Sequence, residues 1–312
     1  MNNIETIQNL IETTKELELR LNLLPYNGTP EIKDINNKKY LYVRKRLLNK
    51  VKSTYVGIYT LELYNILVKN NEERKSINKQ IRSIKKELVN LGYIESIISK
   101  DVLLNIDFAK MNLKTNIYNQ AILEEINITY KQVEDIIDNN IASNMSIIDI
   151  QKILNLKYVW EFITDIDILK MNFNFNILTH ISKIVNERLI YNADKIRVLP
   201  VKINGTTYIP PIPNEEDIKN NIKTIINSDN TIIDKTIELC LYLMRTQAFL
   251  DGNKRTSIIF ANYFLIKNAG GLIIIPKSKV EEFKKLLVKF YETNDTKEIK
   301  KFMIDYCYKK LK

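Results

Sequence analysis

The sequence predicts an all-α protein that carries one short β-hairpin. Only seven glycines and seven prolines occur among the 312 residues, whereas average usage is roughly 7% Gly and 5% Pro. Most of the chain is therefore expected in long helices. No glycine or proline lies within residues 93–199, yet five of them fall within residues 200–213. This distribution indicates helices on both sides of a single irregular segment.

Residues 1–110 are predicted to form an N-terminal helical region. Apolar residues at helical spacing favour one helix over residues 4–24 and a longer helical stretch over residues 39–91, interrupted near Asn70. Gly92 stands where a helix commonly ends. The basic residues in and beside the longer stretch are interpreted as a solvated helix face; they are Lys38, Lys39, Arg44, Lys45, Arg46, Lys50 and Lys52.

Capping signals divide the helices that follow. Thr129 with Gln132, and Ser146 with Asp149, each place a capping side chain three positions after a hydroxyl residue. These pairs predict helices that run to about residues 137 and 162. Apolar periodicity predicts further helices over residues 174–189, 215–226, 232–245, 254–268, 280–291 and 297–310.

The irregular segment has the pattern of a β-hairpin. Two short β-prone runs, residues 198–203 and 206–209, flank Asn204 and Gly205, a dipeptide that is typical of tight hairpin turns. Three prolines follow within five residues. We expect them to end the second strand, because proline has no N–H for a strand ladder.

The composition limits the partners and the compartment. Two cysteines and one histidine are too few for a disulfide framework or a zinc cluster. The chain has no apolar run of 18 residues and no signal-peptide pattern, so we expect a soluble cytoplasmic protein that binds no membrane. Its net charge of +10 is compatible with binding of a nucleic acid. The basic residues are spread along the chain, however, which favours a solvated basic surface. Nucleic-acid binding by basic N-terminal helices is therefore the least favoured interpretation.

Residues 247–256 carry the chemistry. Asp251 and Gly252 lie between two apolar helices and precede a basic helix start at Lys254 and Arg255. Free N–H groups at a helix start bind anions, and a glycine lets a phosphate approach the backbone. The two basic residues add charged donors, and the aspartate can hold a divalent cation. The spacing alone fits an ordinary solvated helix cap equally well.

This segment resembles the Fic (Fido) motif, HxFx(D/E)GN(G/K)RxxR, through Phe249 and the string Asp-Gly-Asn-Lys-Arg at 251–255. Residues 198–211 are similar to the β-hairpin flap of that family. The resemblance implies a Fic-like domain over residues 111–312, helical apart from the flap, with the motif at 247–258. Most members of the family transfer AMP from ATP to a hydroxyl side chain of a target protein.

The resemblance also implies a role for each matching residue. Asp251 would bind Mg²⁺, Gly252 and Asn253 would line the phosphates of ATP or another nucleotide, and Lys254 and Arg255 would clamp them. The flap would align an extended segment of the target by strand addition. The flap residues at its turn are Ile203, Asn204, Gly205 and Thr206.

Two positions depart from the motif. Gln247 stands where the family has its catalytic His, and Ile258 replaces the final Arg. An amide cannot accept the proton of the target hydroxyl, and loss of a general base costs roughly 10²- to 10⁴-fold in rate. We therefore expect a weakened AMP transferase or a pseudoenzyme that retains nucleotide binding. His180, the single histidine, lies on an amphipathic helix and is expected to pack in the core.

Residues 112–127 resemble the inhibitory helix of the family in a degraded form. Its string (S/T)xxxE(G/N) is matched by residues 120–125, with Glu124 at the inhibitory position. In the family this Glu pairs with the final motif Arg. Because Ile258 offers no guanidinium, the pair is either lost or replaced by contact with Arg255. Solvated helix charges at Glu124 and Glu125 are an equally good interpretation.

Two functions from different classes follow from these residues. The first is nucleotide-dependent modification of a protein target that bears a hydroxyl side chain. The alternative is a non-enzymatic module that binds a peptide or protein through the flap. Either interpretation is compatible with a homo-oligomer.

Overall fold

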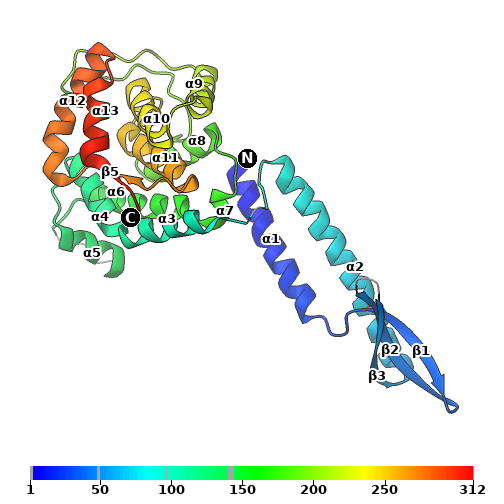
Figure 1. Ribbon diagram of the computed structural model, residues 1–312. Helices are drawn as coiled ribbons and strands as arrows, with labels where there is room; N and C mark the ends of the chain where they lie inside the picture. Colours follow the sequence, from blue (N-terminus) through cyan, green and yellow to red (C-terminus); the bar gives the residue numbers. More distant parts are fainter. Residues whose placement is uncertain (1–2, 48–49, 96, 140–143, 312) are drawn as a thin grey trace. The chain divides into compact units, whose positions relative to one another are not determined.

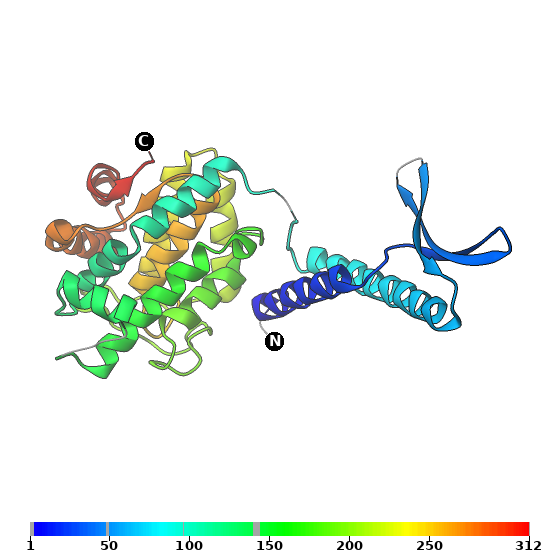
Figure 2. The same ribbon diagram turned by 90° about the horizontal axis from the view of Figure 1, so that it is seen from below.

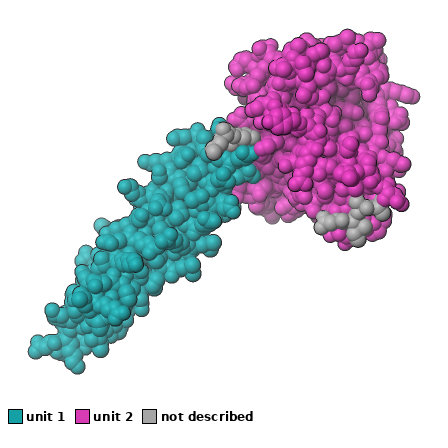
Figure 3. Space-filling model, turned by 180° about the vertical axis from the view of Figure 1, so that it is seen from behind, with its two compact units in different colours: residues 1–94 teal, residues 95–312 magenta. Residues whose placement is uncertain are grey.

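The protein divides into two compact units, residues 1–94 and 95–312 (Figures 1 and 3). The sequence placed the corresponding boundary at residue 110. The computed structural model describes residues 3–47, 50–95, 97–139 and 144–311. None of the helices within these ranges combines the length and the apolar character needed to cross a membrane.

The first unit contains two helices and an antiparallel sheet. Its elements are α1 (Asn3–Leu23), β1 (Thr29–Ile35), β2 (Lys38–Leu47), β3 (Lys50–Ile58) and α2 (Leu61–Asn90), and β2 is the central strand. The side chains of Leu41 and Val43 on β2 pack with Leu67 of α2 to form a small core. This core holds the sheet against the beginning of α2 (Figure 1).

Polar contacts join α1 to α2. Arg20 donates to Glu73 over 2.7 Å. Arg74 donates to the carbonyls of Leu21, at 3.1 Å, and Leu24. Carbonyl groups at the end of a helix have no intrahelical donor, and Arg74 satisfies two of them where α1 ends.

The prediction of a helical stretch over residues 39–91 is wrong in its first part. Residues 38–47 form β2 and residues 50–58 form β3. In β2, Leu41 and Val43 point inward and alternate with Tyr40 and Tyr42, which is the period of a strand. Basic residues at the ends of these strands hid the period of two. The helical part, α2, begins at Leu61 and continues through Asn70 without interruption.

The prediction that the second stretch ends at Gly92 is confirmed. α2 ends at Asn90, and Gly92 adopts a positive φ of 87°. Its N–H bonds to the carbonyl of Val89, and the N–H of Tyr93 bonds to that of Leu88. Glycine suits this position because a left-handed residue commonly ends a helix.

The second unit is helical, as the sequence predicted. Its helices are α3 (Lys100–Met111), α4 (Leu113–Leu123), α5 (Tyr130–Asn139), α6 (Ile147–Ile163), α7 (Ile166–Leu169), α8 (Phe175–Val185), α9 (Glu215–Asn227), α10 (Ile232–Thr246), α11 (Asn253–Lys267), a short 3₁₀ helix (Lys277–Lys279), α12 (Val280–Thr293) and α13 (Lys297–Phe302). The two predicted caps are confirmed: Thr129 and Gln132 bond reciprocally, and Ser146 accepts from the N–H of Asp149.

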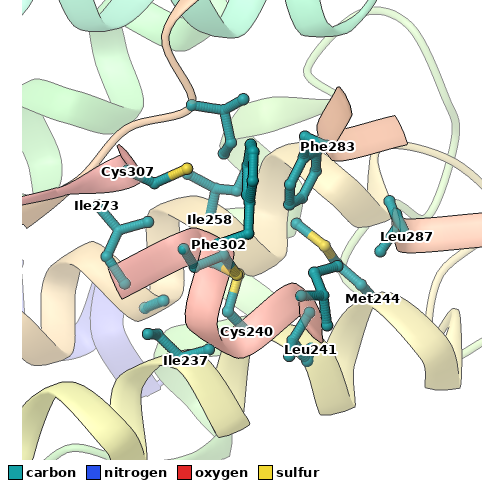
Figure 4. Close-up of a cluster of buried hydrophobic side chains, with 14 of the residues drawn as sticks. Ile237, Cys240, Leu241, Met244, Ile258, Ile273, Phe283, Leu287, Phe302 and Cys307 are labelled. Atoms are coloured by element: carbon teal, nitrogen blue, oxygen red, sulfur yellow. The ribbon is translucent and has the colours of Figure 1, made fainter. Parts of the chain in front are cut away.

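Helix α11 is the centre of this unit (Figure 2). Apart from Lys254 and Lys267, its residues are buried among the surrounding helices. Between α10, α11, α12 and α13 lies the apolar cluster of Figure 4, which includes Cys240, Met244, Ile258 and Phe283. Burial raises the pKa of the Cys240 thiol, which keeps the thiol protonated and unreactive.

The C-terminal helix is shorter than predicted. α13 ends at Phe302 and is followed by a π-helical turn (Met303–Cys307) and β5 (Tyr308–Lys309), which pairs with β4 (Leu272–Ile273). The carbonyl of Lys309 lies so close to Gly271 that a Cβ there would approach its oxygen to 2.3 Å. The glycine therefore permits the approach of the two chain segments.

Ile258 is the position at which the sequence lacks the final motif Arg, and its side chain is part of the core. Ile258→Arg should therefore lower the free energy of unfolding by at least about 2 kcal/mol, because a guanidinium would enter an apolar cluster. Ile258→Val, the matched control, should cost about 0.5–1.5 kcal/mol. Urea denaturation followed by circular dichroism measures both. An Arg variant as stable as the Val variant would contradict this account.

Candidate functional site

Residues 247–252 form the tight connection from α10 to α11. Gln247, the C-cap of α10, has a left-handed conformation with φ of 49°, and Gly252, the N-cap of α11, has φ of 71°. The side-chain amide of Gln247 donates to the carbonyl of Met244 over 2.6 Å. Gln247 therefore turns back onto the end of its own helix.

Asn253 closes this connection into a ring of hydrogen bonds. Its Oδ1 accepts from the N–H of Phe249 at 2.9 Å, and its Nδ2 donates to the carbonyl of Phe249 at 2.7 Å. The ring of Phe249 is buried. The asparagine is thus committed to holding the loop, a role that adds to the phosphate contact implied by the resemblance.

The side-chain amide of Asn186, the residue after α8, lies against the backbone of Gly252. A Cβ at Gly252 would come within 2.6–2.7 Å of the Asn186 amide. The Nδ2 of Asn186 donates to the carbonyls of Asp251, at 3.1 Å, and Ser182, at 3.2 Å. The glycine is required here both by its positive φ and by this close approach. Sequence reasoning did not identify Asn186, since an asparagine at a helix end carries no distinguishing signal.

The side chain of Arg255 is 1% exposed. Its Nε lies 3.3 Å from Oε2 of Glu124, and one terminal nitrogen lies 3.3 Å from Oδ2 of Asp251. The carbonyl of Val185 and Oδ1 of Asn186 each accept over 3.4 Å. Charge-assisted hydrogen bonds are usually about 2.7–2.9 Å long. The guanidinium is therefore surrounded by acceptors, none of which is at the optimal distance.

Glu124 lies at the end of α4 and faces the start of α11. Besides Arg255 it contacts Lys254, whose Nζ is 3.6 Å from Oε1. The sequence allows two outcomes for the inhibitory pair of Glu124, its loss or its replacement by a contact with Arg255. The structure shows the contact with Arg255. Gln120 holds α4 in this position by donating to the carbonyl of Arg255 over 3.2 Å.

The neighbouring carboxylates have different surroundings. Glu125 is exposed and pairs with Lys284 at 2.7 Å, and the hydrogen bond from Lys284 lowers the pKa of that carboxyl. The solvated interpretation thus applies to Glu125 and not to Glu124. The side chain of Asp251 is 60% exposed, so its carboxylate is open to solvent on the side away from Arg255.

The flap does not form the predicted strands. Residues 198–203 and 206–209 have no strand ladder, although Gly205 makes the expected turn with φ of 81°. Pro200 lies within the first arm, and Pro210 and Pro211 directly follow the second, so none of these three positions can donate an N–H to a ladder. The prediction of a β-hairpin at this place is therefore wrong, and the arms are held in another way.

Arg197 joins both arms of the flap to the motif loop. Its guanidinium donates to the carbonyls of Leu199 at 2.7 Å, Pro211 at 2.5 Å and Pro210 at 3.3 Å. Its Nε donates to the carbonyl of Gln247 at 2.6 Å. The residue is 2% exposed, and burial lowers the pKa of this guanidinium. Sequence reasoning missed Arg197, because it is one basic residue among many in this chain.

The tip of the flap is anchored on α12. The hydroxyl of Thr206 donates to the Glu292 carboxylate at 3.0 Å, and the N–H of Thr207 donates to it at 3.2 Å. These hydrogen bonds lower the pKa of the Glu292 carboxyl, and the bond from the Thr207 N–H has the largest effect. Tyr208 stacks on Tyr291 with ring centroids 6.4 Å apart. Ile203 packs against the core of the unit, whereas Asn204 and Gly205 form the turn and Thr206 follows it.

Residues 176–265 match the sequence model of the Fic/DOC family. The matched stretch runs from α8 to α11 and includes the flap and the complete loop at 247–252. The chain contains a Fic domain. A search of curated protein sequences finds no match to the chain.

Solved structures share the fold of this Fic domain. The chain is similar to a Fic family protein from Desulfovibrio desulfuricans G20, with TM-score 0.54, 13% identity and coverage of 67% of this chain and 72% of that one. It is similar to a Fic domain containing signaling protein from Bacteroides thetaiotaomicron VPI-5482, with TM-score 0.54, 15% identity and coverage of 73% and 90%. Fic-1 (residues 134–508) from C. elegans gives TM-score 0.50, 12% identity and coverage of 78% and 79%.

The histidine of this chain lies in the core of the Fic domain and not at its motif. His180 is on α8, is buried, and packs against Phe162 with ring centroids 4.8 Å apart. The motif loop therefore keeps Gln247 at the position where the family has a histidine.

Arg197→Met should release the flap of the Fic domain from the motif loop. We expect a loss of about 3 kcal/mol or more in the free energy of unfolding, because four hydrogen bonds from a charged donor disappear and buried carbonyls lose their partner. Cleavage by a protease of broad specificity should become faster within residues 198–212, as located by mass spectrometry. Lys195→Met removes an exposed charge nearby and should change neither quantity. Undiminished protection of the flap in Arg197→Met would show that the guanidinium does not hold it.

Proposed function

We propose that the Fic domain binds a nucleoside triphosphate, with ATP as the first candidate, together with Mg²⁺ at residues 251–255. We propose further that it transfers AMP to a hydroxyl side chain of a target protein at a rate that Gln247 strongly reduces. The observation that carries the proposal is the guanidinium of Arg255, which is buried at the start of α11 with both carboxylate neighbours 3.3 Å away. A phosphate oxygen is the kind of acceptor that this group suits.

The residues at the site fit a phosphate and a divalent cation. Nε of Arg255 and Oε1 of Glu124 are buried without a hydrogen-bond partner among the described residues, although both lie within ion-pair distance of an opposite charge. An additional anionic oxygen would satisfy the guanidinium. The exposed carboxylate of Asp251 is a hard oxygen ligand of the kind that Mg²⁺ prefers, and a bound Mg²⁺ would neutralise phosphate charge.

The start of α11 supports the same ligand. Gly252 gives this helix no side-chain cap, so the N–H groups of its first turn can face an anion, and the positive end of the helix dipole favours one. Lys254, which is partly exposed, adds a mobile cation at the edge of the site. Asn253 contributes by fixing the loop through Phe249.

Gln247 weakens the proposed reaction at one defined point. Its amide cannot take the proton of the attacking hydroxyl, and its side chain is bonded to the carbonyl of Met244. Binding and charge stabilisation by Arg255 are independent of that proton transfer. We therefore propose that nucleotide binding persists while transfer is slower by roughly 10²- to 10⁴-fold.

Isothermal titration of the protein with Mg²⁺ and ATP tests the binding proposal. Glu124→Gln should raise the affinity about tenfold, because it removes a carboxylate that competes for Arg255. Arg255→Gln should lower the affinity at least tenfold, because the phosphate loses its charged donor. Lys301→Gln removes an exposed charge from the last turn of α13 and serves as the control. A wild-type protein and a Glu124→Gln variant that both ignore nucleotides at millimolar concentration would refute the proposal.

Gln247→His tests the proposed reaction. In the Glu124→Gln background this substitution should raise self-modification or target AMPylation by roughly 10²- to 10⁴-fold, because it supplies a general base. Mass spectrometry of the protein after incubation with ATP detects the added AMP. Gln247→Asn keeps an amide and tolerates a left-handed backbone, so it should give no gain. Equal activity of the His and Asn variants would argue that position 247 does not limit transfer.

A second candidate function rests on the exposed side chains around the flap. Val198, Leu199, Ile209 and Ile212 are all more than half exposed, which is uncommon for a set of aliphatic residues in one segment. The alternative is a non-enzymatic module that holds a peptide or protein against this surface. Under that alternative, peptide binding would survive Arg255→Gln and fail when the turn at Asn204 and Gly205 is deleted.

A further inference from the structure

The sheet of the first unit has one face that does not pack against α2. Leu41 and Val43 point toward α2, so the alternate residues of β2 lie on the opposite side, which we call the outer sheet face. The register places Tyr42 opposite Tyr55 of β3, and Arg44 opposite Ser53. Aromatic and cationic side chains therefore share this face.

The aromatic side chains of the outer sheet face form a cluster. The rings of Tyr42 and Tyr55 meet edge to face with centroids 5.5 Å apart, and those of Tyr40 and Tyr55 are 6.2 Å apart. The ammonium of Lys33 lies 4.5 Å from the centre of the Tyr42 ring. Tyr55 remains 53% exposed. The cluster thus presents an aromatic ring to solvent beside cations.

The charge of the molecule is concentrated in this sheet. Residues 29–58 contain eight Lys and Arg against two Asp and Glu, which gives a net charge of +6, compared with +10 for the whole chain. The sequence-based argument against a nucleic acid assumed dispersed charges on helices. Folding instead gathers the basic run on two adjacent strands.

The end of the β2–β3 pair is cationic on both sides. Arg44 and Arg46 belong to the outer sheet face, while Lys45 lies opposite Lys52 on the other side. Like charges directly opposite each other destabilise a strand pair. Among the described residues no ion pair compensates these four cations; the ion pair of this sheet joins Lys33 to Glu31. Such an arrangement opposes folding and is typical of a surface that binds a polyanion.

We propose that the outer sheet face and the cationic strand ends bind single-stranded nucleic acid. The exposed ring of Tyr55 stacks on a base, and Arg44 and Arg46 neutralise phosphates of the bound nucleic acid. A stacking role favours a single strand over a duplex, because the base faces of a duplex are covered by their neighbours. The exposed aromatic ring also favours a nucleic acid over an anionic membrane, because a membrane would contact the cations and give the ring no base to stack on.

Fluorescence anisotropy of the full chain with a labelled single-stranded oligonucleotide tests the proposal. Arg44→Thr with Arg46→Thr should weaken binding at least about tenfold and reduce the slope of log K against log salt by about 1.4, because two phosphate contacts are lost. Threonine preserves the strand propensity of both positions. Lys75→Gln with Lys79→Gln removes two exposed charges from α2 and should leave binding nearly unchanged.

Tyr55 separates stacking from charge. Tyr55→Ser should weaken binding at least about fivefold, whereas Tyr55→Phe keeps the ring and should bind like the wild type. Circular dichroism verifies that each variant is folded. Equal loss in the α2 control, no effect of Tyr55→Ser, tighter binding to the matched duplex, or binding to phosphatidylserine vesicles without binding to the oligonucleotide would each overturn the proposal.

Discussion

The buried guanidinium of Arg197 is the constraint on which the geometry around the motif depends. An arginine keeps its charge in a folded protein, so its burial requires that acceptors surround it. Here the acceptors are backbone carbonyls from three places in the chain: Leu199, the pair Pro210 and Pro211, and Gln247. Because these carbonyls converge on one planar group, the positions of the flap and of the motif loop are fixed together. The flap is therefore ordered without a strand ladder, because the carbonyls of its prolines accept from Arg197.

A comparison of Arg197 with Arg255 separates two kinds of buried arginine in this Fic domain. Both are almost completely buried. The donors of Arg197 reach three of its four carbonyls at 2.5–2.7 Å, whereas the nearest acceptors of Arg255 are carboxylates at 3.3 Å. The first group is saturated by neutral acceptors that cannot leave. The second is surrounded loosely by acidic side chains, one of which is exposed to solvent, and this is the environment of a cation that can exchange its partner.

The parts of the molecule that were predictable from sequence are those with local causes. The cap of Thr129 with Gln132 and the turn at Gly205 depend on residues within a few positions of one another. Arg197 and Asn186 act on carbonyls 50 and 65 residues away, so no local pattern marks them. The sheet of the first unit was missed for another reason. Its outward positions carry Arg and Lys where a strand usually has β-branched residues, and this masks the alternation around Leu41 and Val43.

The core position of Ile258 changes the meaning of Glu124. In the family that this segment resembles, the inhibitory Glu pairs with the final motif Arg. Here Ile258 belongs to the apolar cluster and Glu124 turns to Arg255. An inhibitory role of Glu124 and the proposed phosphate contact would both use the guanidinium of Arg255, so the carboxylate and the phosphate would compete for one positive charge. Gln120 links α4 to the backbone of Arg255, and release of Glu124 therefore requires either a change of its rotamer or a shift of the end of α4.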